Sequence, residues 1–366
     1  MGKLIALDMN ACDFFVSKLL QAWDEGNCVF PLDQRLPQAG KEHLVRAFGV
    51  SEIISETGAH RVKGASMEPD DALVIATSGT TGNPKGVVIK NAALQASSRM
   101  TSSELGVRNS SDEWLCCIPV SHIGGFSVIS RALHNGVGLK LHRKFDAKLC
   151  EEAGRNGSTL VSLVPTALGR IDPSVFRKVL IGGAAAPQLL PENVVTTYGL
   201  TETGSGIVYN GTPLQNVQIE IRDGEIVVQT PTLFDRYLGD EPRNNDAWFA
   251  TGDAGFFQDD QRLVITGRLD DAIITGGEKV WPTLVERELD SLGLFSEHVV
   301  VGRQDQEWGQ VVTIVGVPNT PDNSMDIKDI RAQLRDTLPN YALPKAIEIV
   351  DNLPRNAMGK ILRRSI

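Results

Sequence analysis

Long uninterrupted hydrophobic runs are scarce in this chain of 366 residues. The most apolar stretch, Leu115 to Ile129, contains Pro119 and His122 and is too short to span a bilayer. The chain also opens without a basic segment followed by an apolar one, which is the pattern of a secretory signal. We therefore expect neither membrane insertion nor export.

Cysteine is sparse, and no excess of positive charge is present. The five cysteines show neither CxxC metal spacing nor an even disulfide framework, which favours a reducing, cytoplasmic location. Lysine and arginine total 36 against 45 acidic residues, and the net charge of −9 is spread along the sequence. This balance argues against nucleic-acid binding, although it allows a local basic pocket for a phosphate-bearing small molecule.

The length of the chain favours two domains, because single hydrophobic cores usually split below this size. Strand-like and helical runs alternate over the first two-thirds, which is typical of a layered α/β domain. From about Gly211 the pattern becomes β-rich, and after Gly267-Arg268 a smaller α+β unit follows. We place the domains at 1–268 and 272–366, with a mobile hinge at 269–271.

Several elements can be placed from local signals. We expect a helix over Ala92–Leu105 with Asn91 as its N-cap, a helix opened by Pro282, and a helix over Ile327–Leu338. Strands are expected at Ala72–Ala76, Gly86–Ile89, Leu160–Val164, Val179–Ile181, Gln218–Ile221, Glu225–Gln229, Ala272–Thr275, His298–Val301 and Val311–Val317.

The strongest chemical signal is the sequence TSGTTGNPKG, which lies between two of these strand-like runs. Its candidate phosphate-binding residues are Thr77, Ser78, Gly79, Thr80, Thr81, Gly82 and Lys85. Glycine lets backbone N–H groups approach phosphate oxygens, hydroxyl groups donate further hydrogen bonds, and lysine adds a positive charge. The spacing differs from that of a Walker A loop, and an extended run follows instead of a helix.

This loop resembles the phosphate-loop signature of the adenylate-forming superfamily, which includes acyl- and aryl-CoA ligases, peptide-synthetase adenylation domains and firefly luciferase. Further blocks of that superfamily follow in the same order. They are YGLTET at 198–203, TGD at 251–253, GRLDD at 267–271, GGE at 276–278 with Trp281-Pro282, and PRNAMGKI at 354–361.

The resemblance implies an enzyme that uses ATP and Mg²⁺ to convert a carboxylic acid into its acyl-AMP and pyrophosphate. Thr201 would donate to the α-phosphate, and Glu202 would hold Mg²⁺, a hard cation that prefers oxygen ligands. Tyr198 would lie against the adenine ring, and the turn 182–187 would form the other wall. Gly183 and Ala184 of that turn, and Gly199 beside Tyr198, are further candidate nucleotide-binding residues.

Four further roles follow from the same resemblance. Asp253 would accept hydrogen bonds from the ribose hydroxyls, with Arg268 donating beside it. Lys360 would neutralise the attacking carboxylate and the α-phosphate in the transition state, a form of stabilisation that is commonly the largest catalytic contribution. His122 would line and gate the acyl pocket. Asp146 is expected to be only a helix cap or turn residue.

The acceptor of the acyl group separates the classes within the superfamily. Gly276 and Gly277 offer backbone without side chains where a pantetheine thiol would pass, which favours coenzyme A as the second substrate. The short N-terminal portion, the segment 31–37 and the segment 204–211 resemble compact o-succinylbenzoate–CoA ligases of menaquinone biosynthesis in actinobacteria. Another small aryl- or acyl-CoA ligase and a non-catalytic nucleotide-binding homologue are the alternatives. The oligomeric state is left open, a homodimer included.

Overall fold

The computed structural model describes residues 1–62, 64–78, 84–184, 186–187, 189–244, 246–319, 325–355 and 361–366. The chain divides into two compact units. The first combines Met1–Ile219 with Val228–Phe249, and the second combines Glu220–Val227 with Ala250–Ile366. The expected hinge at 269–271 lies inside the second unit, because residues 250–268 group with the C-terminal residues. Rotation at 269–271 remains a prediction.

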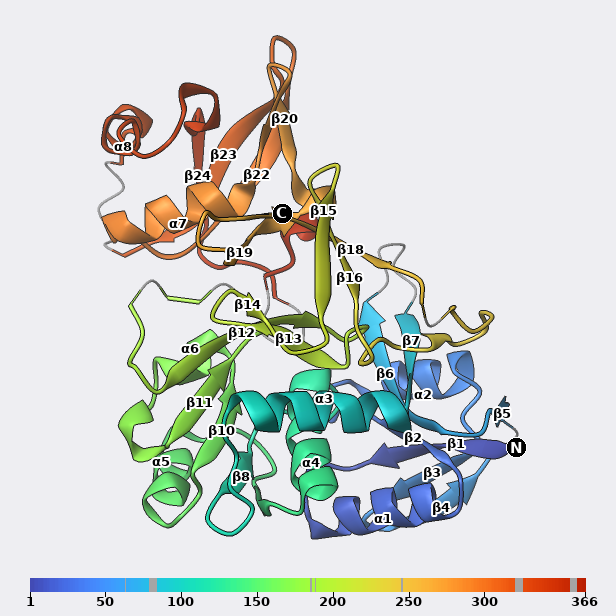
Figure 1. Cartoon of the computed structure of the whole chain (residues 1–366). Helices are drawn as coiled ribbons and strands as arrows, with labels where there is room; N and C mark the ends of the chain where they lie inside the picture. The colour runs from blue at the N-terminus through green and yellow to red at the C-terminus, as the bar shows by residue number, and fades with distance from the viewer. Residues whose placement is uncertain are drawn as a thin grey trace. The chain divides into compact units, whose positions relative to one another are not determined.

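The first unit contains two mixed sheets (Figure 1). One sheet has the order β17-β7-β6-β2-β1-β3-β4, with β5 paired to β1. Its strands are β1 (Gly2–Asp8), β2 (Cys28–Pro31), β3 (Glu52–Ser55), β4 (Gly58–Arg61), β5 (Ser66–Met67), β6 (Asp71–Ser78), β7 (Pro84–Lys90) and β17 (Arg236–Tyr237). β6 and β7 form an antiparallel pair in which Thr77 faces Lys85. β17 joins the outer side of β7, although well over a hundred residues separate them in the sequence.

The other sheet of this unit has the order β14-β13-β12-β11-β10-β8-β9. Its strands are β8 (Glu113–Cys116), β9 (Gly138–Leu141), β10 (Leu160–Leu163), β11 (Lys178–Ile181), β12 (Val194–Leu200), β13 (Ser205–Tyr209) and β14 (Thr212–Pro213). The strands from β9 to β12 run parallel, so their carboxyl ends meet at one edge of the sheet. Ligands of open α/β sheets bind at such edges.

Helices connect and cover these strands. They are α1 (Asp13–Asp24), α2 (Gln38–Ala47), α3 (Asn91–Glu104), α4 (Ile123–Asn135), α5 (Ala147–Arg155) and α6 (Pro165–Leu168). α3 contacts β6 and β7 of one sheet and β13 of the other, and α4 packs on α3 and on β8, β10 and β13 (Figure 1). The core between them buries Phe15, Trp114 and Phe126 completely. This layered α/β arrangement confirms the expected fold class.

Two local predictions can be checked at helix starts. The N-cap of α3 is Lys90, whereas Asn91 is the first helical residue and its Oδ1 lies 3.1 Å from His134 Nε2, so the predicted cap was wrong by one residue. Asp146 caps α5 as expected, because its carboxylate accepts a hydrogen bond from the Leu149 backbone N–H.

The second unit is β-rich and carries its own hydrophobic core. One sheet has the order β15-β16-β18-β19, with β15 (Gln218–Arg222), β16 (Glu225–Gln229), β18 (Phe249–Phe257) and β19 (Leu263–Arg268). The other has the order β21-β20-β23-β22, with β24 also paired to β23. Its strands are β20 (Ile273–Thr275), β21 (Glu278–Val280), β22 (Phe295–Asp305), β23 (Gly309–Pro318) and β24 (Ala346–Ile349).

Two helices pack on this core. α7 (Pro282–Leu292) begins at its proline as predicted, whereas α8 (Ile327–Leu334) ends four residues before the predicted Leu338. Val285 and Leu289 of α7 are buried with Ile330 of α8. No helix among the described residues is both long and apolar enough to cross a membrane.

Candidate active site

The phosphate loop connects β6 to β7. Thr77 and Lys85 flank it, and the Thr77 hydroxyl donates to the Lys85 carbonyl oxygen at 3.4 Å. The Lys85 side chain is exposed, and its ammonium lies 4.8 Å from the centroid of the Tyr237 ring. Gly79, Thr80, Thr81 and Gly82 lie outside the described residues, as does the side chain of Ser78. The strand after the loop confirms that it is not a Walker A loop.

Tyr237 links this loop to the expected magnesium ligand. Its hydroxyl donates to Glu202 Oε1 at 3.0 Å, and the Phe234 backbone N–H donates to the Glu202 carbonyl at 2.8 Å. Burial and then the negative charge of Glu202 raise the pKa of Tyr237 well above its usual range, so the hydroxyl stays protonated and can donate. Tyr237 was not predicted from the sequence, because only the pairing of β17 with β7 brings it close to this loop.

Thr201 and Glu202 lie in a tight turn between β12 and β13. The Gly204 N–H donates to the Thr201 carbonyl at 3.0 Å, and the buried Thr203 hydroxyl donates to the Ser205 carbonyl at 2.7 Å. Gly199 must lack a side chain, because a Cβ there would collide with the Ser205 carbonyl oxygen. These contacts fix the turn while leaving Thr201 and Glu202 half-buried and accessible to a ligand.

A buried arginine supports the strand that leaves this turn. Arg131 of α4 is only 3% exposed, and its guanidinium donates to the hydroxyls of Ser205 at 3.1 Å and Ser162 at 3.4 Å. The Ser205 hydroxyl also lies 3.0 Å from the Ser97 hydroxyl. Burial lowers the pKa of Arg131. The network connects α3, α4, β10 and β13 directly behind the turn.

The residues expected around the adenine come together at one sheet edge. β11 and β12 are parallel neighbours with Ile181 opposite Thr196, so the turn at Gly183-Ala184 and the residue Tyr198 both follow at the carboxyl ends of the strands. Gly183 has φ = +82°, a conformation that glycine adopts without strain. This placement agrees with the predicted adenine slot, whose occupant remains a prediction.

His122 lies beside the phosphate-loop hairpin. Its Nε2 is 2.5 Å from Arg35 Nη2 and 3.3 Å from Asp33 Oδ2, and it precedes α4 as N-cap. A pocket of about 170 Å³ lies at this cluster. It is lined by Phe30, Pro31, Asp33, Leu36, Leu44, Ala76, Thr77, Pro84, Ser121 and His122. His122 thus lines a pocket, and its role in acid binding remains a prediction. Its neighbour Arg35 was not among the residues predicted from the sequence.

The charge of Asp33 is secured by this cluster. Burial raises the pKa of Asp33, but hydrogen bonds from Arg35 and His122 outweigh that effect and hold the pKa far below its usual range. Arg35 makes a bidentate pair with Asp33 through Nε at 2.8 Å and Nη2 at 2.6 Å. The result is a fixed Asp33 carboxylate in the lining of a mainly apolar pocket.

In the second unit, Asp253 and Arg268 form a pair. Arg268 Nη1 donates to Asp253 Oδ1 at 3.0 Å and to the Thr251 carbonyl at 2.8 Å. Gly252 has φ = +72°, and a side chain there would meet the Arg268 guanidinium. Asp253 is 6% exposed, while 39% of the Arg268 side chain remains exposed. The structure thus places these two predicted residues together.

Gly276 and Gly277 form the turn between β20 and β21. Their φ values of +58° and +86° fit a two-residue hairpin turn that needs positive φ at both positions. A Cβ on Gly276 would also meet the Trp308 ring, over which Lys345 Nζ lies 3.1 Å from the centroid. Hairpin geometry therefore accounts for both glycines, and packing against Trp308 further accounts for Gly276. The contact of either glycine with coenzyme A remains a prediction.

Lys360 lies outside the described residues. The residues that flank its segment, Arg355 and Ile361, form an isolated antiparallel bridge. Arg363, three residues beyond Lys360, contacts Asp271 at 3.3 Å and Glu286 at 2.5 Å. The C-terminal segment is therefore anchored on both sides of the predicted catalytic lysine.

Two other features do not belong to this site. The carboxylates of Glu68, Asp71 and Asp235 cluster at a spacing that suits a metal, but Arg236 contacts all three of them and Lys90 contacts Asp235 at 2.9 Å.

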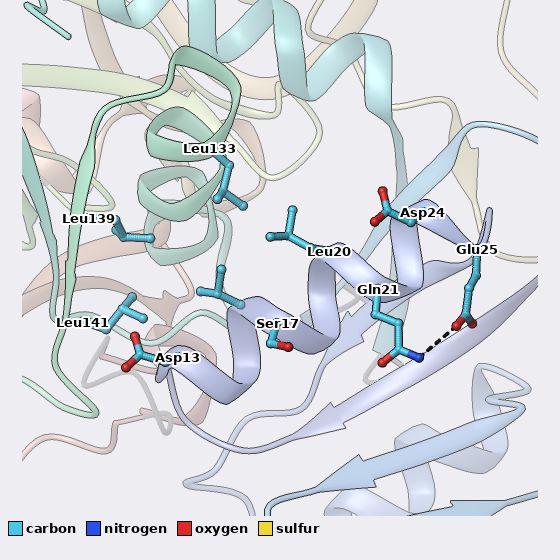
Figure 2. Close-up of a pocket in the computed structure, with 10 residues that line it drawn as sticks. Asp13, Ser17, Leu20, Gln21, Asp24, Glu25, Leu133, Leu139 and Leu141 are labelled. Atoms are coloured by element: carbon cyan, nitrogen blue, oxygen red, sulfur yellow. Dashed lines mark hydrogen bonds between the residues drawn. The ribbon is translucent and has the colours of Figure 1, made fainter. Parts of the chain in front are cut away.

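A wider groove of about 770 Å³ lies among α1, α4 and β9. Figure 2 shows Leu20, Leu133, Leu139 and Leu141 pointing toward one another there. None of the predicted site residues lines it.

Comparison with known proteins agrees with this arrangement. Residues 24–238 match the family model "AMP-binding enzyme", and residues 285–360 match "AMP-binding enzyme C-terminal domain". The 2-succinylbenzoate–CoA ligase of Bacillus licheniformis is 35% identical over 82% of this chain and 71% of that protein. The corresponding ligase of Lactococcus lactis is 33% identical over 81% of this chain and 71% of that protein.

Solved structures show the same similarity. The o-succinylbenzoate CoA synthetase of Bacillus subtilis in complex with the acyl-adenylate intermediate has a TM-score of 0.87 and 27% identity, covering 99% of this chain and 87% of that one. The same enzyme with ATP and magnesium ion has a TM-score of 0.87 and 26% identity, covering 99% and 89%.

Proposed function

We propose that this chain, which belongs to the family of AMP-binding enzymes, activates 2-succinylbenzoate with ATP and transfers the acyl group to coenzyme A. It is an AMP-forming acid–thiol ligase. The observation that carries the choice of acid is the similarity to 2-succinylbenzoate–CoA ligases over four-fifths of the chain.

The first half-reaction joins the acid to AMP. A carboxylate oxygen of the acid attacks the α-phosphorus of ATP, the bond to the β-phosphate breaks, and pyrophosphate leaves with the bonding electrons. Thr201 would donate to the α-phosphate, and Lys85 and the phosphate loop would neutralise the leaving group. Lys360 would balance the charge of the attacking carboxylate, which otherwise repels the phosphate.

Mg²⁺ fits the residues that the structure shows. The Glu202 carboxylate is half-buried and has one oxygen, Oε2, free of the hydrogen bond from Tyr237 that Oε1 accepts. Hard oxygen donors of this kind suit Mg²⁺, which keeps several waters and substrate phosphates in its shell. When bound, Mg²⁺ would neutralise phosphate charge. Glu202 would hold it, and the turn 201–204 would orient Glu202.

The second half-reaction forms the thioester. The thiolate sulfur of coenzyme A attacks the acyl carbon, and AMP leaves as the carbon–oxygen bond breaks. We propose that the thiol passes along the Gly276-Gly277 turn. A Cβ added to Gly277 would have no other atom within 4 Å, so the space beside this glycine is open. Because Lys360 and this turn serve different steps, we propose that the segment 272–366 alternates between two orientations about 269–271.

The pocket at His122 suits an aryl acid. Its lining is mainly apolar, with Asp33 and His122 among the polar members, and Arg35 contacts both of them. An aromatic ring can bury its faces against such a lining. We propose that His122 gates this pocket.

A thioester assay tests the proposal. Purified protein is incubated with ATP, Mg²⁺, coenzyme A and single acids from a panel of aryl and aliphatic carboxylates that includes 2-succinylbenzoate. We expect 2-succinylbenzoate to give the highest kcat/KM, with AMP and pyrophosphate as products. A higher value for another acid would assign the enzyme to that acid, and ADP as the stoichiometric product would contradict the adenylate mechanism.

Two further proposals concern the setting of the enzyme. The five cysteines are free thiols, as expected in a reducing compartment, and ATP and coenzyme A are available in the cytoplasm. We therefore propose a cytoplasmic enzyme. A homodimer remains a prediction that sedimentation or light scattering would test.

A further inference from the structure

We propose that Tyr237 is a positioning residue that holds the magnesium ligand Glu202 and the phosphate-loop lysine Lys85 in one arrangement. The inference rests on the proposed function, because it assigns the support of that same ATP site. It is carried by two contacts of one side chain: the hydroxyl donates to Glu202 Oε1 at 3.0 Å, and the ring lies 4.8 Å from Lys85 Nζ.

The first contact orients the carboxylate. A hydrogen bond to Oε1 occupies one oxygen of Glu202 and fixes the plane of the carboxylate, so that Oε2 can serve as the oxygen that binds a cation. The backbone of Glu202 is fixed as well, because its carbonyl accepts from the Phe234 N–H at 2.8 Å. Partners that hydrogen-bond a metal-binding carboxylate commonly change metal affinity by about 10- to 100-fold when they are removed.

The second contact restrains the lysine. Lys85 is exposed, and a lysine side chain has many rotamers that must be ordered before it can meet a phosphate. The face of an aromatic ring attracts an ammonium group at this distance, so Tyr237 limits where Lys85 lies before ATP arrives. Tyr237 thereby positions both the Lys85 ammonium and the Glu202 carboxylate for the triphosphate of one ATP molecule.

Tyr237 is itself held firmly. Its backbone pairs with Val87 of β7, two residues after Lys85, so the ring is tied to the strand that carries the lysine. Its ring packs on Phe234 with a centroid distance of 4.8 Å, and Phe234 packs on Phe249 at 5.3 Å. A side chain fixed on both backbone and ring can transmit its position to the two groups that it contacts.

Two substitutions separate the two contacts. Tyr237→Phe removes the hydroxyl and keeps the ring near Lys85, whereas Tyr237→Leu removes both. Tyr209→Phe is the matched control, because Tyr209 is buried and its hydroxyl bonds Thr101 at 2.9 Å, away from Glu202 and Lys85. Circular dichroism and thermal unfolding verify that each variant is folded.

The readout is ATP binding by isothermal titration calorimetry in the absence of acid and coenzyme A. Each protein is titrated with ATP in excess Mg²⁺ and with ATP in EDTA. For the unsubstituted protein and Tyr209→Phe, we expect Mg²⁺ to tighten binding. Tyr237→Phe should lose about tenfold or more of the affinity for Mg·ATP while its affinity for ATP in EDTA stays unchanged. Tyr237→Leu should weaken both.

The possible results separate the role of Tyr237 from the proposed function of the enzyme. If the unsubstituted protein binds Mg·ATP more tightly than ATP but Tyr237→Phe keeps the same ratio, Tyr237 does not position Glu202, and the proposed function stands. If the unsubstituted protein shows no binding of ATP under either condition, the proposed function fails and this inference with it. If Tyr209→Phe and Tyr237→Phe lose the same affinity for Mg·ATP, the loss comes from general packing, and the inference is overturned.

Discussion

Arg268 Nη1 lies 3.0 Å from Asp253 Oδ1, at a point where the two residues face each other in the β18–β19 ladder. The guanidinium therefore holds the carboxylate in a defined orientation on a rigid pair of strands. Asp253 is nearly buried, and an ionised carboxylate can accept hydrogen bonds through both of its oxygens. Such an acceptor suits the two neighbouring hydroxyls of a ribose. This geometry motivates the first prediction.

We predict that Asp253→Ala weakens ATP binding because the ribose loses its acceptor. Each hydrogen bond to a charged group contributes about 1.5–3 kcal/mol. Calorimetry with ATP and 2′-deoxy-ATP gives the test: the analogue should bind more weakly than ATP in the unsubstituted protein and equally in Asp253→Ala. Asp260→Ala, in the exposed turn of the same strand pair, is the control. A difference between the nucleotides that survives in Asp253→Ala would assign the ribose to other residues.

A second prediction concerns stability. Arg236 bonds Asp71 at 2.7 Å and Asp235 at 2.6 Å, and all three side chains are buried. Arg236→Met would leave the buried Asp71 carboxylate without its ion-pair partner and Asp235 with Lys90 alone, so we expect a loss of about 3–5 kcal/mol in the free energy of unfolding. Chemical denaturation measures it.

Arg143→Met is the matched comparison for that experiment. Arg143 makes an equally short pair with Glu56 at 2.6 Å, but both side chains are largely exposed and solvent screens them. We expect its free energy of unfolding to change little in the same denaturation experiment. A similar loss in both variants would show that burial does not govern the strength of these pairs.

The third prediction is a pH effect on stability. His134 is half-buried, with Nδ1 2.9 Å from the Ser130 carbonyl and Nε2 3.1 Å from Asn91 Oδ1, and burial lowers its pKa below the ordinary value of 6.5. A histidine of lowered pKa stabilises the fold fully above 6.5, and this contribution is lost as the pH falls from 6.5 toward the lowered pKa, since the unfolded chain then binds the proton more readily.

Thermal unfolding between about pH 7.5 and pH 5 checks this effect. In His134→Gln the decrease of Tm across that range should be smaller than in the unsubstituted protein. His43→Gln, at an exposed position of α2, should leave the decrease unchanged. An unaltered pH profile in His134→Gln would assign the acid sensitivity to other groups.

The fourth prediction separates the half-reactions. Lys360→Ala should lose acyl-AMP formation by about a hundredfold or more, because the developing charge loses its partner, yet still convert supplied acyl-AMP and coenzyme A to thioester. Gly277→Trp should form acyl-AMP and fail in the thioester step. Equal impairment of both steps in both variants would contradict domain alternation.

The structure adds a control to that experiment. Gly277 has φ = +86°, so any side chain strains the turn as well as filling the thiol path. Gly277→Asn tolerates this φ better and adds little bulk. We expect thioester formation to decrease far more in Gly277→Trp than in Gly277→Asn. Equal losses would show that the shape of the turn, and not an open path, is what the reaction needs.

Most of the fold class was predictable, because hydrophobic periodicity and glycine or proline boundaries are local signals. The strands at Ala72–Ala76 and Gly86–Ile89 lie within β6 and β7, and the α/β alternation is confirmed. Local signals were weaker at boundaries. Lys90 caps α3 in place of Asn91, whose side chain bonds His134 instead, a tertiary contact that the sequence does not show.

The site was predictable where its residues sit in compact motifs. Thr201 and Glu202 are adjacent in the sequence, and Thr77 and Lys85 belong to one short motif, so each pair is recognised together. Tyr237 and Arg131 were missed because their contacts depend on strand pairing and helix packing across long separations. The boundaries of the two compact units were not predictable from composition either. Residues 220–227 belong to the second unit although residues 228–249, which follow them, belong to the first.

The indole of Trp308 provides a natural optical signal in the second unit. Its ring meets Gly276 at the predicted thiol path, lies under the Lys345 ammonium at 3.1 Å, and is 40% exposed to solvent. Indole emission changes with the polarity and charge around the ring. Coenzyme A entering beside this turn should therefore alter tryptophan fluorescence, which would allow the encounter to be followed by stopped flow without any attached dye.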